Sequence, residues 1–188
     1  ILQQLNKYLN NPFVVDLRAL AMMRIGVGLL LLADLWLRAP DVVAWLTDSG
    51  VLPRDLSMDF SNDYRWSLYW LNGSEFWASS LMVMAGIFSV MLVLGLRTRM
   101  ASVASFILLV SLHNRNPLLL QGGDNLLLLT VFWGCFLPWG QRLAIDASMV
   151  RQPSNNNRLL NVVTAAFVIQ VLSVYFFFGV IKNWQRMG

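Results

Sequence analysis

The chain has 188 residues, of which 57% are hydrophobic and 13% are charged, and its mean hydropathy is +0.57. A soluble domain carries about 25% charged residues, so this composition excludes an ordinary soluble domain and predicts a helical membrane protein. The net charge of +4 comes from basic residues scattered singly near helix ends, which is typical of membrane proteins and does not indicate nucleic-acid binding. The single cysteine, Cys135, excludes an intrachain disulfide and a cysteine-based metal site.

Apolar blocks recur along the chain, and about 20 apolar residues span the hydrocarbon core of a bilayer. We predict a short amphipathic helix over residues 1–13 that lies on the membrane, followed by five membrane spans. The predicted spans cover about residues 17–36, 76–96, 101–112, 117–139 and 159–181. The third block is short, so we expect its helix to extend beyond one of these bounds. The predicted fold class is all-α, a polytopic transmembrane helical bundle.

The polar segment 38–74, between the first two spans, is rich in aspartate and tryptophan. Indole rings favour the interface between water and lipid, so we predict that this segment folds as a cap on one membrane face. The lysine and arginine residues of the short loops place the N-terminus in the cytoplasm. The cap, the turn 113–117 and Lys182 then share the outer face.

Charged residues inside spans are costly, by about 2.5–3.5 kcal/mol on insertion scales, and face the bundle interior. Asp34 and Arg38 are spaced i, i+4, so we predict an ion pair that stabilises the end of the first span. Arg24 lies beside Gly26 and Gly28, where small residues allow close helix approach. Two interpretations of Arg24 stay open: a buried ion pair between two helices, or a functional group.

The Gly122–Asn125 string, inside the fourth block, has two interpretations. It is a break at membrane depth that lines a wet cavity, or a helix start with Asp124 complementing the helix dipole. His113, the only histidine, is either a turn residue at the interface or a group that titrates near neutral pH. With no cysteine or acidic neighbours beside it, we predict no metal site.

Lys182 follows 23 residues, Leu159–Ile181, that contain no charge. A lysine in this position either reaches to the lipid headgroups or sits desolvated, with a lowered pKa that makes it a competent general base. Both interpretations are compatible with the sequence pattern. Because the sequence begins at Ile1 rather than Met and stops soon after this span, we also expect that it is truncated, above all at the C-terminus.

Several strings resemble, in order and over nearly the whole chain, the HTTM domain, the membrane domain shared by vitamin K-dependent γ-carboxylases and many bacterial proteins. The strings are Arg24–Gly28, Asp34–Asp41, Trp45, Asp48–Arg54, Asn114–Pro117, Gly122–Asp124, Phe136–Pro138, Asp146–Ala147 and Tyr175–Lys182. The resemblance implies a single HTTM-like transmembrane domain over residues 1–188. It also implies an integral protein of a bacterial inner membrane, since the chain is closer to the short bacterial members.

In the carboxylases, the lysine of the tyrosine–phenylalanine–x–x–glycine–x–x–lysine string deprotonates reduced vitamin K, and Lys182 matches that position. The resemblance therefore implies a quinol as cofactor, with Lys182, Asp124 and His113 as catalytic candidates. It further implies Asn114, Tyr175 and Arg24 as cofactor-binding candidates. The matching position of the second active-site histidine is occupied here by Gly123 and Asp124, and nothing in these 188 residues could form the large lumenal domain of the carboxylases. We therefore do not expect carboxylation of peptide glutamate.

Two functional hypotheses remain. In the first, an outward-facing pocket between spans binds a quinol or another lipid-soluble redox molecule, with Lys182 as general base. In the second, the chain is a non-catalytic membrane subunit that packs against other subunits, and its ionisable residues stabilise helix ends. The expected partners are the lipid bilayer and, in the second hypothesis, other membrane proteins.

Overall fold

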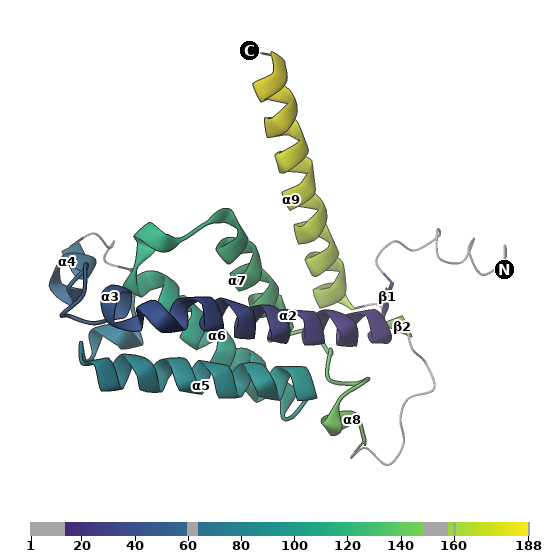
Figure 1. Ribbon diagram of the computed structural model, residues 1–188. Helices are drawn as coiled ribbons and strands as arrows, with labels where there is room; N and C mark the ends of the chain where they lie inside the picture. The colour runs from purple at the N-terminus through teal and green to yellow at the C-terminus, as the bar shows by residue number, and fades with distance from the viewer. Residues whose placement is uncertain (1–13, 60–63, 149–157, 160, 188) are drawn as a thin grey trace, which may run out of the picture.

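The computed structural model describes residues 14–59, 64–148, 158–159 and 161–187, and in the last helix it describes side chains as far as Phe177. The described chain is mainly α-helical, which confirms the predicted all-α class (Figure 1). Its helices are α2 (Leu17–Arg38), α3 (Val42–Leu46), α4 (Arg54–Asp59), α5 (Glu75–Leu94), α6 (Thr98–Arg115), α7 (Gly122–Gly134), α8 (Ile145–Ser148) and α9 (Val162–Met187). Short 3-10 helices are η1 (Ala39–Asp41), η2 (Leu68–Trp70) and η3 (Pro117–Leu119). The predicted helix over residues 1–13 lies outside the described residues.

A small antiparallel pairing joins the segment before α2 to the segment before α9. Strand β1 (Val15–Asp16) pairs with β2 (Arg158–Leu159), with Val15 opposite Leu159. Asp16 then caps α2, because its carboxylate accepts a hydrogen bond from the Arg18 N–H at 2.8 Å. The pairing therefore fixes the start of α2 beside the start of α9.

Helices α2, α5 and α6 lie side by side and form the body of the molecule (Figure 1). Gly28 sets the contact between α2 and α5, because an added Cβ would lie 2.7 Å from Val93 Cγ2 and 3.1 Å from the Ser89 carbonyl oxygen. A Cβ at Gly26 would meet nothing within 4 Å. The predicted close helix approach is therefore right at Gly28 and wrong at Gly26, which lies on another side of the same helix.

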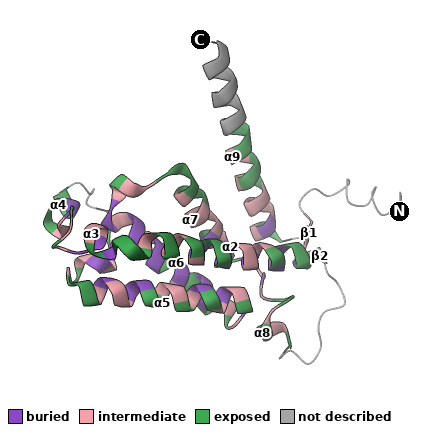
Figure 2. Cartoon of the chain, viewed as in Figure 1, coloured by how far each residue is buried: buried purple, intermediate pink, exposed green. Residues whose placement is uncertain are grey.

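Apolar residues are buried where the helices meet, and exposed residues cover the outer faces (Figure 2). One buried cluster joins α2, α5, α6 and α7 to Trp139, which lies 1% exposed against Gly134. A second cluster joins the segment 39–74, which we call the cap, to α5 and α6 through Val42, Leu46 and Tyr69. The prediction that this segment folds onto the bundle is confirmed for its described residues.

Two described segments, Leu17–Leu46 and Glu75–Leu94, are long and apolar enough to cross a membrane by length and composition. The other predicted spans are not confirmed. At about 1.5 Å per residue, the 13 residues of α7 reach only about 20 Å, and buried serines and His113 make α6 more polar. The apolar part of α9 described here is Val162–Phe177, and α9 leaves the bundle steeply instead of lying along α2 and α5 (Figure 1).

Candidate functional site: a polar pocket beneath the cap

The fourth apolar block is interrupted because α7 begins only at Gly122. The Gln121 N–H donates to Asp124 Oδ2 at 2.8 Å, which closes the first turn of the helix. Pro117, which has no N–H, ends the preceding helix. Of the two interpretations of this string, the helix start is therefore correct, and Asp124 caps it.

An ion cluster joins the end of α2 to the start of α7. Arg38 Nε lies 2.8 Å from Asp34 Oδ1, which confirms the predicted pair. Arg38 Nη2 also lies 3.1 Å from Asp124 Oδ1, a contact that the sequence did not predict. All three side chains are about one-fifth exposed, with values of 22%, 19% and 15% for Arg38, Asp34 and Asp124. One guanidinium therefore serves two carboxylates from different helices.

The cluster lines a pocket of about 360 Å³ between the cap and the bundle. The cap contributes Asp41, Trp45 and Leu46 to its wall, and the segment after α6 contributes Asn116 and Leu119. The remaining lining residues are Asp34, Leu37, Arg38, Leu112, Gln121 and Asp124. The pocket thus combines a positive group, carboxylates and amides with an aromatic wall, as small-molecule sites commonly do.

Asn116 lines this pocket, and its amide nitrogen is an unused hydrogen-bond donor buried in the wall. The residue is 3% exposed, and its Oδ1 accepts a hydrogen bond from the Leu118 N–H at 3.2 Å, which fixes the orientation of the amide. Its Nδ2 is buried and has no partner among the described residues. A buried amide donor without a partner costs about 1–3 kcal/mol, so a ligand oxygen in the pocket would relieve this cost.

His113 lies behind the pocket wall and does not line it. The imidazole is 4% exposed, and neither ring nitrogen has a hydrogen-bond partner within the described part of the chain. The charges of Asp124, Arg38 and Asp34 act on it. His113 and Asp124 thus interact electrostatically, without a hydrogen bond to either imidazole nitrogen, and their catalytic roles stay predictions. Within the described residues, no group of three or more metal-ligating side chains is present.

The other candidate residues lie elsewhere. Asn114 donates to the Trp66 carbonyl oxygen at 2.8 Å and so holds the cap. Tyr175 is exposed in an apolar groove of about 350 Å³ between α7 and α9. Arg24, in α2, lies beside Gly95 near the start of α6, whereas His113 lies near the end of that helix. The side chain of Lys182 is outside the part of the chain that the structure describes. The roles predicted for these residues stay predictions.

Arg24 corrects one sequence interpretation. It is fully buried, and its Nη2 donates to the Leu143 carbonyl oxygen, in the loop that follows α7. Its guanidinium also lies where a side chain at Gly95 would be, 1.9 Å from an added Cβ. Arg24 therefore joins α2 to a loop carbonyl, and among the described residues no carboxylate lies within ion-pair distance of it.

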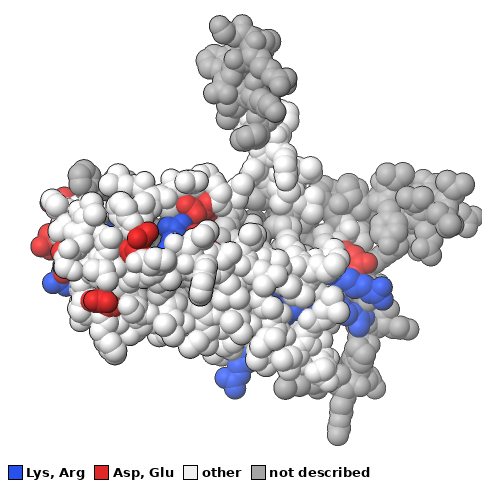
Figure 3. Space-filling model, viewed as in Figure 1, with Lys and Arg blue, Asp and Glu red and all other residues white. Residues whose placement is uncertain are grey.

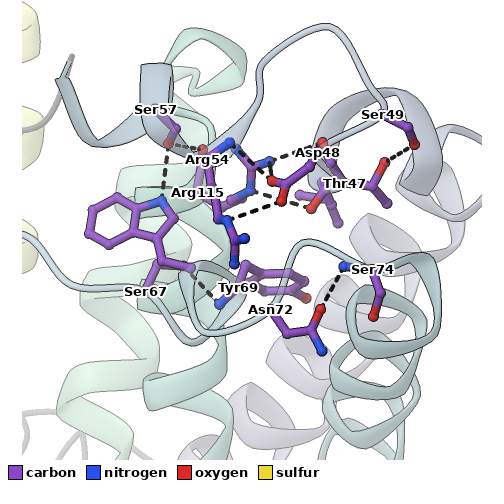
Figure 4. A network of polar contacts seen from close by, with 12 residues as sticks. Thr47, Asp48, Ser49, Arg54, Ser57, Ser67, Tyr69, Asn72, Ser74 and Arg115 are labelled. Atoms are coloured by element: carbon purple, nitrogen blue, oxygen red, sulfur yellow. Dashed lines mark hydrogen bonds and ion pairs between the residues drawn. The ribbon is translucent and has the colours of Figure 1, made fainter.

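The cap is held in place by Arg115, which is fully buried (Figure 4). Its Nε donates to the Leu46 carbonyl oxygen at 3.3 Å, and its Nη2 donates to that of Thr47 at 3.1 Å. Asp48 lies 3.9 Å from Arg115 Nη2 and forms a closer pair with Arg54, at 3.0 Å. The end of α6 is therefore the anchor that positions the cap over the pocket.

A second junction closes the opposite end of the bundle. Asp146 in α8 accepts hydrogen bonds from the N–H groups of Arg97 and Thr98, each at 2.8 Å, and from the Thr98 hydroxyl at 3.1 Å. Burial raises the pKa of the Asp146 carboxyl, but the backbone donors of Thr98 and Arg97 outweigh it and hold the pKa below its usual value of 3.8. Asp146 therefore fixes α8 to the turn between α5 and α6.

We expect Asp146→Asn to lower the melting temperature by a few degrees at pH 7, since about 1 kcal/mol shifts it by roughly 2–4 °C in a chain of this size. Because the folded pKa lies below 3.8, the stability contributed by ionised Asp146 is present above that value. It is lost as the pH falls below 3.8 toward the folded pKa. The difference between wild type and variant, measured by melting at stepped pH, should shrink in that range. Asp55→Asn, at an exposed site in α4, controls for loss of one charge; an equal, pH-independent effect of both variants contradicts this role.

Arg38, Asn116 and Gln121 are site residues that sequence reasoning missed. Arg38 was assigned only a structural role, and its second partner is 86 positions away. Asn116 precedes Pro117 at the break after α6, a position whose backbone is extended by steric conflict with the proline ring. The sequence did contain a signal for this site. Asn116 is a polar residue at a helix end terminated by proline, and Gln121 and Asp124 follow within one short segment.

The fold and the pocket together define an all-α protein with two helices that qualify as membrane spans and a polar pocket under a cap. Comparison with known proteins does not narrow this class: no family model matches the chain, and no match was found among curated proteins or solved structures.

Proposed function

We propose that the chain is an integral membrane protein of the HTTM and γ-carboxylase-like type, which binds a quinol or another lipid-soluble redox molecule with Lys182 as general base. In this proposal the five apolar blocks of the sequence are spans, the membrane is a bacterial inner membrane, and the N-terminus is cytoplasmic. The observation that carries the binding function is the unpartnered Asn116 amide in a pocket that also holds Arg38 and three carboxylates.

Exposed apolar side chains support the membrane assignment. Only 33% of the apolar window in Leu17–Leu46 and 28% of that in Glu75–Leu94 are buried, whereas a core helix of a soluble protein is mostly buried. Large exposed side chains include Leu37 at 75% and Phe76 at 82%. On the face shown in Figure 3, most charged side chains lie toward the ends of the long helices, with a broad uncharged surface between them. Lipid would cover that surface.

Charge also supports the proposed orientation. The cap end of the bundle carries most of the described acidic residues, namely Asp34, Asp41, Asp48, Asp55, Asp59, Glu75 and Asp124. The cap end also carries four arginines, Arg38, Arg54, Arg65 and Arg115, and the opposite end carries Arg18, Arg97, Arg99 and Arg142 with Asp16 and Asp146. The arginines of the opposite end lie in short connections, where positive residues favour the cytoplasmic side, so in this proposal the cap faces outward.

The pocket residues suit the head of a quinol. The Asn116 Nδ2 donates to one quinol oxygen, and the carboxylates of Asp34 and Asp124 accept from its hydroxyl group. When a base removes the hydroxyl proton, the resulting oxyanion carries a negative charge, which the Arg38 guanidinium stabilises by a charge-assisted hydrogen bond. Lys182, neutral when desolvated, is the base that the family resemblance implies.

The apolar groove between α7 and α9 suits the remainder of such a molecule. Leu126, Leu129, Trp133 and Phe167 contribute to its walls, and Tyr175 lies at the edge. In Figure 1 the two helices run in opposite directions, and the later part of α9 extends away from the bundle. A common site for Lys182 and Asp124 stays a proposal.

Binding of a short-chain quinone to the purified protein tests the pocket. Asn116→Ala removes the unpaired donor, so we expect affinity to fall by about 2- to 12-fold, the worth of one hydrogen bond of about 0.5–1.5 kcal/mol. Asn72→Ala is the matched control, since Asn72 is exposed and does not line the pocket. The readout is quenching of tryptophan fluorescence, to which Trp45 contributes from the pocket wall. Equal affinities for wild type and Asn116→Ala would exclude this pocket.

In the same assay, Lys182→Met tests the base. The substitution keeps an apolar stem and removes the amine, so quinone binding should persist. The absorption change of bound quinol on conversion to its anion, measured without oxygen, should be lost. A variant that still deprotonates the quinol would show that another group is the base.

A non-catalytic subunit is the second candidate, and one observation favours it. α9 leaves the bundle, and Ile169, Leu172, Phe176 and Phe177 are exposed on it. Another membrane protein could cover these residues as well as lipid can. Co-purification of a stoichiometric partner chain, together with absent quinone binding, would favour this candidate.

A further inference from the structure

A cavity of about 680 Å³ lies at the end opposite the cap. It is bounded by the α5–α6 turn, the start of α6, the segment 136–142 and α8. Three arginines line it: Arg97, Arg99 and Arg142. Thr98 and Gln141 add polar groups to the same wall. The cavity therefore presents a concentrated positive charge together with hydrogen-bond donors.

One carboxylate, Asp146, also lines this cavity, but its oxygens are already engaged. Oδ1 accepts from the Arg97 N–H, and Oδ2 accepts from the N–H and hydroxyl of Thr98. The carboxylate thereby holds the backbone of the α5–α6 turn and does not bridge to the side chains of Arg97 or Arg99 in any described contact. Both of those arginines are exposed at the cavity, so their guanidinium groups are available to an anion.

Apolar residues make up the rest of the cavity wall. They are Leu17, Met100, Phe136, Leu137, Pro138, Trp139 and Ala147, of which Met100 and Phe136 are exposed. A soluble phosphate would leave this surface in contact with water, whereas a phospholipid would cover it with glycerol and the first part of its acyl chains. Guanidinium groups bind phosphate oxygens in a bidentate manner. The combination of arginines and apolar surface thus matches a lipid better than a small anion.

We propose that this cavity binds the headgroup of an anionic phospholipid, with the phosphate held by Arg97 and Arg99. The cavity lies at the basic end of the bundle, where a cytoplasmic leaflet rich in anionic lipid would meet it. Quinol chemistry at the cap end uses none of these residues. The proposals of lipid binding and of quinol binding can therefore be tested, and rejected, independently of one another.

The test uses the full chain in a zwitterionic detergent and follows its melting temperature as dioctanoyl phosphatidylglycerol is added. Two other compounds are added in parallel experiments. Dioctanoyl phosphatidylcholine has the acyl chains without the net negative charge, and glycerol 3-phosphate has the charged phosphate without the acyl chains. We expect a saturable rise with phosphatidylglycerol only. In Arg97→Gln/Arg99→Gln, the half-saturating concentration should rise by about 25-fold, since each arginine near an anionic membrane surface contributes about fivefold.

Arg65→Gln, at an exposed site in the cap, is the matched control and should leave the half-saturating concentration unchanged. Native mass spectrometry of wild type and double variant counts retained lipid, and this readout stands even if the double variant melts at a lower temperature. An equal rise with phosphatidylcholine, saturation by glycerol 3-phosphate alone, or equal responses of wild type and double variant would overturn the proposal.

Discussion

Arg115→Met is expected to release the cap from the end of α6 and to lower the free energy of unfolding by about 2–4 kcal/mol. The substitution leaves the Leu46 and Thr47 carbonyl oxygens, which Arg115 serves, without their donors, and each buried unpaired group costs about 1–3 kcal/mol. At roughly 2–4 °C per kcal/mol, the melting temperature should fall by about 10 °C. A thermal melt of the purified protein measures this effect.

Arg54→Met is the control, because Arg54 pairs with the same Asp48 but is 39% exposed. Exposed pairs contribute about 0–1 kcal/mol, so its effect should be much smaller. Limited proteolysis within residues 40–74 locates the change, since a detached cap is cleaved faster. Equal losses for the two variants would mean that the charge of Asp48, and not the buried guanidinium, holds the cap.

Arg38→Met is expected to have the second large effect, a loss of about 3–5 kcal/mol, which is the cost of leaving buried charges without their partner. Asp34 and Asp124 would then face one another with no counter-charge. Replacing both carboxylates in addition, in Asp34→Asn/Arg38→Met/Asp124→Asn, should recover part of the loss because no unpaired charge remains. Melting temperatures of the single, double and triple variants measure the coupling.

The shared guanidinium of Arg38 leads to a second expectation for these variants. Because Asp34 and Asp124 contact one Arg38, the effects of Asp34→Asn and Asp124→Asn should not add. Asp41→Asn is the control. Asp41 lines the same pocket but does not pair with Arg38 in the described structure. Additive losses, or a triple variant no more stable than Arg38→Met, would contradict an ion cluster as the stabilising element.

Local spacing explains which features the sequence could predict. The pair Asp34–Arg38 is one helical turn apart, so the helix alone brings the charges together. The limits of α5 follow similarly from Ser74, which caps it, and from Gly95, whose positive φ of 72° ends it. These features depend on neighbours in sequence, and the all-α class depends on composition.

Contacts between distant segments explain what the sequence could not predict. Asp124 joins Arg38 only because α7 packs beside the end of α2, and Arg24 finds its partner at Leu143, a residue with a positive φ of 47° in an irregular loop. Hydropathy also gives no direction for a helix, so the steep departure of α9 was not visible in the apolar run 159–181. The pocket itself arises from the cap, whose path between α2 and α5 has no sequence period.

Asp124 divides its two oxygens between two tasks, and this division links the pocket to the secondary structure beneath it. Oδ2 closes the first turn of α7 through the Gln121 N–H, and Oδ1 holds Arg38. A ligand that attracts Arg38 therefore weakens the contact between Arg38 and Asp124, the same carboxylate that caps the first turn of α7. Binding in the pocket should therefore change how often the first turn of α7 opens. The rate at which the Gln121 amide hydrogen exchanges with solvent measures this opening.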